Sequence, residues 1–142
     1  MKVFLMGEVR TQVKLINAAD ESLARRGQLP PEEVRTYEAS ALVDTGAVCT
    51  ILPADVVQAL GLASIHRRGV EYADGRNESV PVTESLVLVI RGRRTSDEAL
   101  VLGNEVLIGQ TILEKLDLHV DCANQILIPN PAHPDQAVNK VK

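Results

Sequence analysis

The sequence predicts an all-β fold, and two observations carry this prediction. Aromatic residues are scarce, with one Phe, two Tyr and no Trp, so the core must be aliphatic. Valine, leucine and isoleucine alternate with polar residues in several short stretches that turn signals separate. With 142 residues the chain has the size of one domain. We expect that domain over residues 1–130 and a flexible tail over residues 131–142.

The first part of the chain reads as two strands that a polar insertion separates. Residues 8–17 alternate between apolar and polar side chains well enough for a strand. Residues 18–33 are mostly polar and contain one glycine and two prolines, which is typical of a surface insertion with one helical turn in its first half. Residues 34–43 resume the strand pattern and lead directly into Asp44, which we therefore expect at a strand end.

A strand and a short helix are predicted next. Residues 50–52 are a strand exit, and Pro53 occupies a favourable position in the first turn of a helix. Val56 and Leu60 lie on one face of this helix, and Gly61 is the expected stop. Its role is packing.

A β-hairpin follows the helix. Residues 64–73 and 78–82 flank the dipeptide Asp74-Gly75, which supplies the positive φ values that a tight turn requires. The remaining elements are short and apolar, apart from one basic turn. In chain order we expect a strand over 84–90, a basic turn at 91–94, a strand over 98–102, a helix over 110–116, and strands over 118–120 and 125–128.

Charge and the first residues exclude several classes of partner. The formal net charge is −4, and the small basic groups are each bordered by acidic or apolar sequence, so we expect no nucleic-acid partner. The apolar run over residues 3–6 is too short for a signal-peptide core or a membrane span. We expect a cytoplasmic protein with no membrane partner.

The cysteines and histidines form no recognisable metal motif. Cys49 and Cys122 cannot build a disulfide framework, and we expect both to be reduced. His119 and Asp121 share one face of a predicted strand while Cys122 lies on the other, which is poor geometry for one metal ion. We expect no metal and no cofactor. A packed thiol is the simplest role for Cys49, and oxidation that gates dimer formation or cleft access is the alternative.

The motif Asp44-Thr45-Gly46 gains its meaning from its context. The apolar strand end 41–43 precedes it and Ala47 follows it, while the later segment 107–109, Leu-Ile-Gly, leads into another short helix. Over about residues 8–129, this ordered set resembles the retropepsin-like aspartic protease family, including its small bacterial members. The resemblance implies a closed, mostly antiparallel β barrel with one or two short helices.

The resemblance also implies an aspartic endopeptidase in which Asp44 is the catalytic carboxylate. Hydrolysis of a peptide bond by this route needs two carboxylates that share one proton, one to take a proton from water and one to polarise the carbonyl. This chain carries one Asp-Thr-Gly motif. A two-fold axis would supply the second carboxylate, so the resemblance implies an obligatory homodimer acting on a peptide or protein substrate.

Other residues receive roles from the same resemblance. Thr45 would bond across the axis, Gly46 would let the backbone approach the carboxylates, and Ala47 would line the cleft. Ile108 and Gly109 would support the catalytic loop from behind. The flap hairpin would close over a bound peptide through a tip formed by Tyr72, Ala73, Asp74 and Gly75.

Three departures from viral relatives leave alternatives open. Val48 and Cys49 stand where many of those relatives carry acidic residues, the flap tip has one glycine, and the insertion at 18–33 is long. A non-catalytic dimeric peptide-binding module on the same fold is one alternative, and a monomer with an incomplete site is another. Segments Lys2–Leu5 and 125–128 are expected to interleave as the sheet between subunits.

Overall fold

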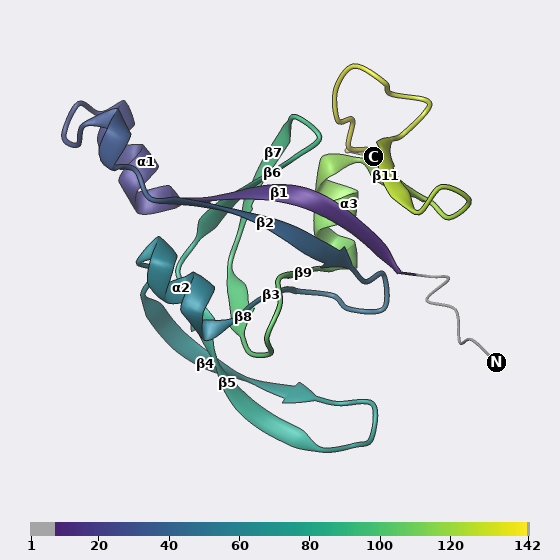
Figure 1. Cartoon of the computed structure of the whole chain (residues 1–142), viewed down its shortest axis with the longest axis horizontal. Helices are drawn as coiled ribbons and strands as arrows, with labels where there is room; N and C mark the ends of the chain where they lie inside the picture. Colours follow the sequence, from purple (N-terminus) through teal and green to yellow (C-terminus); the bar gives the residue numbers. More distant parts are fainter. Residues whose placement is uncertain (1–7, 142) are drawn as a thin grey trace.

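The computed structural model describes residues 8–141 and consists mostly of β-strands (Figure 1). The predicted interface segment Lys2–Leu5 lies outside these residues. In chain order the elements are β1 (Val9–Asn17), α1 (Ala18–Arg25), the 3₁₀ helix η1 (Pro31–Glu33), β2 (Thr36–Val43), β3 (Thr50–Leu52), α2 (Ala54–Leu60), β4 (Ser64–Glu71), β5 (Asn77–Thr83), β6 (Leu86–Ile90), β7 (Arg93–Asp97), β8 (Ala99–Val101), β9 (Leu107–Ile108), α3 (Gln110–Leu116), β10 (Leu118–Asp121) and β11 (Ile126–Pro129).

Nine strands form one sheet in the order β4-β5-β8-β3-β9-β2-β1-β6-β7, and β10 pairs with β11 in a second sheet. The longest ladder is the antiparallel pair β1 and β2, from Val9 opposite Val43 to Ile16 opposite Thr36. Within residues 8–141 no pairing joins the outer strands β4 and β7, so closure into a barrel stays a prediction.

Strand β9 lies between β2 and β3 in the sheet, close to Asp44. It runs parallel to β2, with Val43 opposite Ile108, and antiparallel to β3, with Ile51 opposite Leu107. Because β9 lies between β2 and β3, the chain must loop out after β2 before it can return as β3. That loop carries residues 44–49.

The core is aliphatic, as the composition predicts. The fully buried large side chains are all leucine, isoleucine or valine, and they include Leu15 and Leu88, which lie opposite each other across β1 and β6. A smaller cluster of Val80, Val82 and Leu100 packs at the base of the β4–β5 hairpin. No residue of the hairpin tip, residues 72–76, belongs to this cluster or to the main core.

Helices α2 and α3 confirm the predictions made for them from the sequence. Helix α2 begins directly after Pro53 and ends at Gly61, which has φ 65°, a left-handed conformation that glycine adopts without strain. Helix α3 spans the predicted residues 110–116 and ends at Asp117, which has φ 55°. Both helices bury their apolar face against the sheet.

The insertion at 18–33 holds more helix than the single turn expected. Helix α1 has 8 residues, and Asn17 caps it by accepting a hydrogen bond from the N–H of Asp20. Asp20 is buried and accepts from the backbone N–H and the Nε of Arg35, at 3.0 and 2.7 Å. The guanidinium of Arg35 also fills the space beside Gly61. These contacts attach the insertion to the C-terminal end of α2.

The predicted basic turn at 91–94 is wrong in extent. Only Arg91 and Gly92 turn, both with positive φ, and β7 begins at Arg93 and pairs with β6. The strand predicted over 98–102 is β8, which pairs with β3 and β5 and not with β6. Within residues 8–141 no helix is long and apolar enough to span a membrane.

Candidate active site

Asp44 stands at the first position after β2, and backbone contacts orient it. Its N–H donates to the carbonyl of Ile108 at 2.9 Å, which continues the parallel ladder between β2 and β9 by one residue. Its Oδ1 accepts from the N–H of Gly46 at 2.9 Å. Within residues 8–141 the other carboxylate oxygen, Oδ2, accepts no hydrogen bond. The strand end thus presents a partly buried carboxylate with one oxygen engaged and one available.

Gly109 allows the loop to lie directly on β9 and α3. A Cβ at this position would stand 2.8 Å from the carbonyl oxygens of Ala47 and Cys49 and from the carbonyl carbon of Val48. The φ of Gly109 is an ordinary −93°, so glycine is needed here for space and not for conformation. The close approach lets the N–H of Gln110 donate to Ala47 at 2.8 Å, so the loop caps the first turn of α3.

The loop's outer residues face away from the core. Thr45 and Gly46 are exposed, and Val48 keeps 69% of its surface accessible, which is unusual for a valine in a tightly held loop. Thr45 lines an open groove of about 470 Å³ together with residues of α3 and β10, among them Gln110 and His119. The loop therefore presents both its motif and an apolar side chain at the surface.

The β4–β5 hairpin ends in a three-residue turn. The N–H of Tyr72 donates to the carbonyl of Arg76 at 2.8 Å, and of the expected Asp74-Gly75 pair only Gly75 has a positive φ, 89°. Arg76 donates from Nε to Asp74 at 2.8 Å and stacks 4.7 Å from the centre of the Tyr72 ring. Hydrogen bonds from Arg76 lower the pKa of Asp74, and the hydrogen bond to Glu78 raises the pKa of Tyr72.

The structure brings some predicted site residues together and leaves others apart. Asp44, Thr45, Gly46 and Ala47 form one loop, and Ile108 and Gly109 lie directly behind it. The tip residues Tyr72 to Gly75 project on the same side of the molecule as this loop (Figure 1). Within residues 8–141 no hydrogen bond joins the tip to Asp44.

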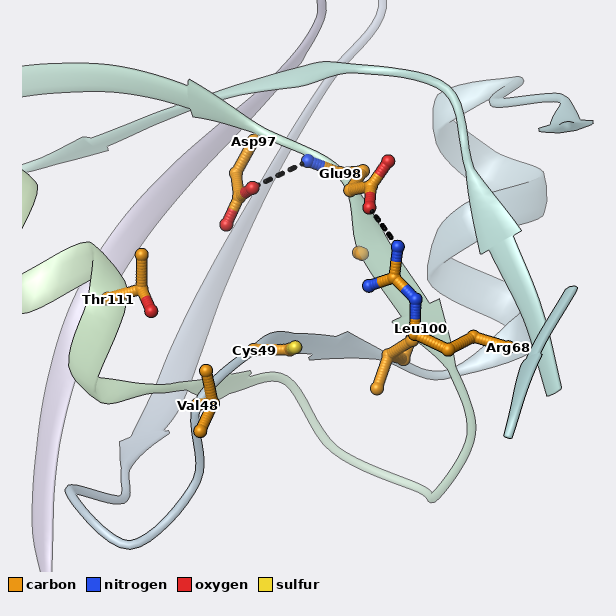
Figure 2. Close-up of a pocket in the computed structure, with 8 residues that line it drawn as sticks. Val48, Cys49, Arg68, Asp97, Glu98, Leu100 and Thr111 are labelled. Carbon is orange, nitrogen blue, oxygen red and sulfur yellow. Dashed lines mark hydrogen bonds and ion pairs between the residues drawn. The ribbon is translucent and has the colours of Figure 1, made fainter. Parts of the chain in front are cut away.

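A small pocket lies between the base of the β4–β5 hairpin and the loop 44–49 (Figure 2). It has a volume of about 100 Å³, and its lining residues are Val48, Cys49, Arg68, Asp97, Glu98, Ala99, Leu100 and Thr111. Arg68 from β4 pairs with Glu98 at 2.8 Å, and both residues line the pocket. The sequence gives no signal for Arg68 or Asp97, because strands distant in the chain bring them here.

Thr50 is a further residue that sequence reasoning missed. It directly follows Cys49, lies opposite Ala99 in the parallel pair of β3 and β8, and is fully buried. Its hydroxyl has no hydrogen-bond partner among the described residues. A hydroxyl-bearing residue at the strand exit was visible in the sequence, but its burial was not.

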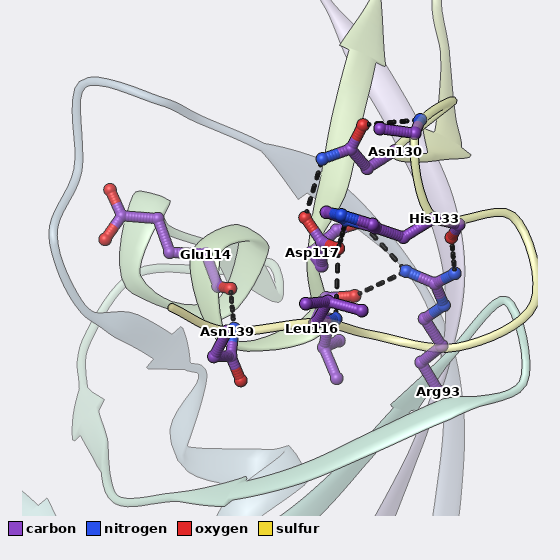
Figure 3. A network of polar contacts seen from close by, with 9 residues as sticks. Arg93, Glu114, Leu116, Asp117, Asn130, His133 and Asn139 are labelled. Carbon is purple, nitrogen blue, oxygen red and sulfur yellow. Dashed lines mark hydrogen bonds and ion pairs between the residues drawn. The ribbon is translucent and has the colours of Figure 1, made fainter. Parts of the chain in front are cut away.

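The C-terminal end of α3 carries a separate polar network (Figure 3). The carboxylate of Asp117 accepts from Asn130 at 2.9 Å, from the N–H of Val138 at 3.1 Å, and contacts Nδ1 of His133 at 2.6 Å. Arg93 donates to the carbonyl oxygens of Asp117 and His133. The hydrogen bond from Asn130, with the other contacts, lowers the pKa of Asp117 to about 2. These bonds attach the irregular segment 130–141 to α3.

The described residues offer no clustered metal ligands. Within residues 8–141 no group of three or more His, Cys, Asp or Glu side chains could hold a metal ion. Cys49 is partly buried, Cys122 is exposed, and neither forms a disulfide.

Comparison with known proteins identifies the fold. No family model matches the chain, and no curated protein matches it. The structure of EIAV protease complexed with the inhibitor HBY-793 is similar, with a TM-score of 0.52 and 20% identity over 80% of this chain and 92% of that chain. The solution structure of Simian Foamy Virus (mac) protease has a TM-score of 0.46 and 15% identity over 73% of this chain and 90% of that chain. The first likeness shows a retropepsin-like fold.

Proposed function

We propose that this chain, which has a retropepsin-like fold, is an aspartic endopeptidase that acts as a homodimer. The observation that carries the proposal is the setting of Asp44. Its backbone is held by Ile108, its Oδ1 by the N–H of Gly46, and its loop by the contact with Gly109, while Oδ2 remains available. A carboxylate fixed in this way suits proton transfer because its position does not change during the reaction.

The chemistry requires a second carboxylate. Two neighbouring carboxylates hold one proton between them because their charges repel, so one can take a proton from water while the other donates to the scissile carbonyl. The chain has one Asp-Thr-Gly motif, and Thr45 beside Asp44 is exposed. A two-fold axis at this loop would place two copies of Asp44 side by side, with Thr45 bonding across the axis and the barrel closed as in the family.

The remaining roles follow from this arrangement. Ala47 would line the cleft, and the hairpin tip, Tyr72 to Gly75, would close over an extended peptide by strand-like hydrogen bonds. Ile108 and Gly109 would keep the loop in place. We propose action on peptide segments in the cytoplasm, by one domain over residues 1–130, without a cofactor and without nucleic-acid or membrane partners.

A direct test measures turnover of a peptide library at mildly acidic pH. Asp44→Asn should lower the rate by on the order of 10³-fold or more, because the amide can neither take nor share the proton. Asp135→Asn, in the exposed C-terminal segment, is the matched control and should leave the rate unchanged. Equal cleavage by the native chain and Asp44→Asn would refute the proposal. Sedimentation of the native chain should show a dimer at concentrations where it is active.

A non-catalytic dimeric peptide-binding module is the second candidate. The exposed Val48 favours it, because an apolar side chain beside the motif suits peptide contact without adding any catalytic group. This function predicts peptide binding that Asp44→Asn does not change, together with no turnover. A monomer at all working concentrations would instead indicate an incomplete site.

A further inference from the structure

The pocket between the hairpin base and the Asp44 loop has the size of one amino-acid side chain. Its volume is about 100 Å³. Sites for whole small molecules occupy roughly 300–1,000 Å³, so this pocket is too small for such a ligand. Val48 and Cys49, which line it, follow Asp44 in the same loop. The pocket therefore borders the loop that carries Asp44, and a side chain held there would belong to a peptide that contacts this loop.

One wall of the pocket is apolar. The side chains of Val48 and Leu100 border it, and Ala99 adds a buried methyl group. Figure 2 shows Val48 and Leu100 on the side of the pocket opposite Asp97. Such a wall suits the methylene stem of a long side chain, which lysine and arginine pack on apolar surface while the charged head stays polar.

Two of the charged residues that line the pocket are paired with each other. Arg68 pairs with Glu98 at 2.8 Å, and His66 lies 3.7 Å from the other oxygen of Glu98. Since the guanidinium and this carboxylate neutralise each other, neither determines the charge that the pocket prefers. The charge preference of the pocket therefore depends on Asp97.

Asp97 has an available oxygen. Its Oδ1 accepts from the N–H of Glu98 at 2.9 Å, and Lys115 stands 3.9 Å from this same oxygen while donating to the carbonyl of Ser96 at 3.1 Å. Within residues 8–141 Oδ2 accepts no hydrogen bond, and Figure 2 shows it pointing away from Glu98 toward the side of the pocket where Thr111 lies. The side chain is 20% exposed, and burial raises the pKa of Asp97.

We propose that this pocket receives a lysine or arginine side chain of the peptide substrate, with Asp97 as the specificity-determining residue; the inference rests on the proposed function. The charged head would donate to Oδ2 of Asp97 beside Thr111, and the stem would pack on Val48 and Leu100. Buried acceptors gain most from charged donors, whereas an acidic side chain would meet the carboxylate of Asp97 and be rejected. Alternate side chains of an extended peptide point to opposite faces, so one position near the cut should carry the preference.

The test sequences the cut sites that the native chain produces in a peptide library with all residues represented. We expect one position near the cut at which lysine and arginine exceed norleucine by about tenfold and glutamate is depleted. Asp97→Asn should reduce that ratio to near one, and Glu105→Gln, a surface carboxylate paired with Arg10, should leave it unchanged. A flat profile at every position, or a preference that survives Asp97→Asn, would overturn the inference.

A binding measurement separates this inference from the proposed function. Calorimetry with the Asp44→Asn variant compares sets of three peptides. The peptides of a set differ only at one position, which carries lysine, norleucine or glutamate, and each position is varied in turn. Tighter binding of the lysine peptide, lost in the double variant with Asp97→Asn, supports the pocket even where the native chain cuts nothing and the proposed hydrolysis fails. Cleavage without any such discrimination leaves hydrolysis standing and refutes the pocket. Absence of binding to all three peptides refutes the pocket as well.

Discussion

The Asp44 loop and the β4–β5 hairpin are both irregular segments at the same side of the molecule, yet different contacts hold them. The loop is held by backbone bonds to Ile108 and Gln110, far away in the sequence. The hairpin tip is held by Arg76, Asp74 and Glu78, all within a few residues of Tyr72. The loop geometry therefore depends on the whole fold, while the tip can change shape without disturbing the core.

The largest expected effect on stability comes from filling the space at Gly109. In Gly109→Ala the added methyl group would meet three backbone atoms at 2.8 Å, and backbone cannot rotate away as a side chain can. We expect a loss of about 1–3 kcal/mol in the free energy of unfolding, as for other overpacked sites. Turnover should fall by about 10²-fold, since the loop that carries Asp44 must shift. Urea denaturation and peptide-cleavage rates measure the two effects.

The matched substitution in the hairpin is Gly69→Ala. No atom lies within 4 Å of the position a Cβ would take, and the φ of Gly69 is not positive. Stability and turnover should both stay close to native. If Gly69→Ala were as damaging as Gly109→Ala, the distinction between a globally held loop and a locally held hairpin would be wrong.

A second prediction concerns the other end of the helix that supports the loop. The pKa of Asp117 is about 2 in the folded protein and near 3.8 when unfolded, so its contribution to stability is present above about pH 4 and is lost as the pH falls through about 2. Asp117→Asn should lower stability at pH 7, by less than Gly109→Ala does, and should flatten the loss between pH 4 and 2. Denaturation curves across this pH range provide the measurement.

Asp74 is the hairpin counterpart of Asp117. Its pKa is also lowered, by hydrogen bonds from Arg76, but all its partners lie within the exposed tip. Asp74→Asn should therefore leave the midpoint of global unfolding unchanged at every pH. A change as large as that of Asp117→Asn would mean that the tip is coupled to the core.

A small effect is expected at Tyr72. Tyr72→Phe removes the hydrogen bond to Glu78 and keeps the ring under Arg76. Because the bond is exposed, we expect KM for peptides to change by no more than about threefold and the melting temperature to stay the same. A large fall in kcat with unchanged KM would show that the hydroxyl contributes to the reaction itself.

Local signals were sufficient for the elements whose ends are marked in the chain. Pro53 and Gly61 bound α2 as expected, and residues 110–116 form the predicted helix. Strand β7 escaped prediction because Arg93 to Asp97 has no apolar alternation, and only its pairing with β6 makes it a strand. Helix α1 was underestimated although Asn17, its cap, precedes acidic residues that favour a helix start.

The candidate site was predictable only where its residues are contiguous in the sequence. The Asp44 motif is contiguous, so the resemblance could point to it directly. The need for glycine at position 109 arises from a close approach of residues 47–49, and the pocket at Asp97 arises where three strands, helix α3 and a loop meet. Neither the close approach at Gly109 nor the pocket at Asp97 follows from a local sequence pattern, so both could be recognised only in the folded structure.

Strand β4 has a further consequence for how this protein behaves at high concentration. It is an outermost strand of the sheet, and most of its residues are exposed. An open strand edge can template pairing with other copies and so lead to fibrils. Here the edge carries Arg67, Arg68 and His66 in succession. Arg67 has no acidic partner among the described residues, so its charge discourages the pairing of like edges and with it aggregation.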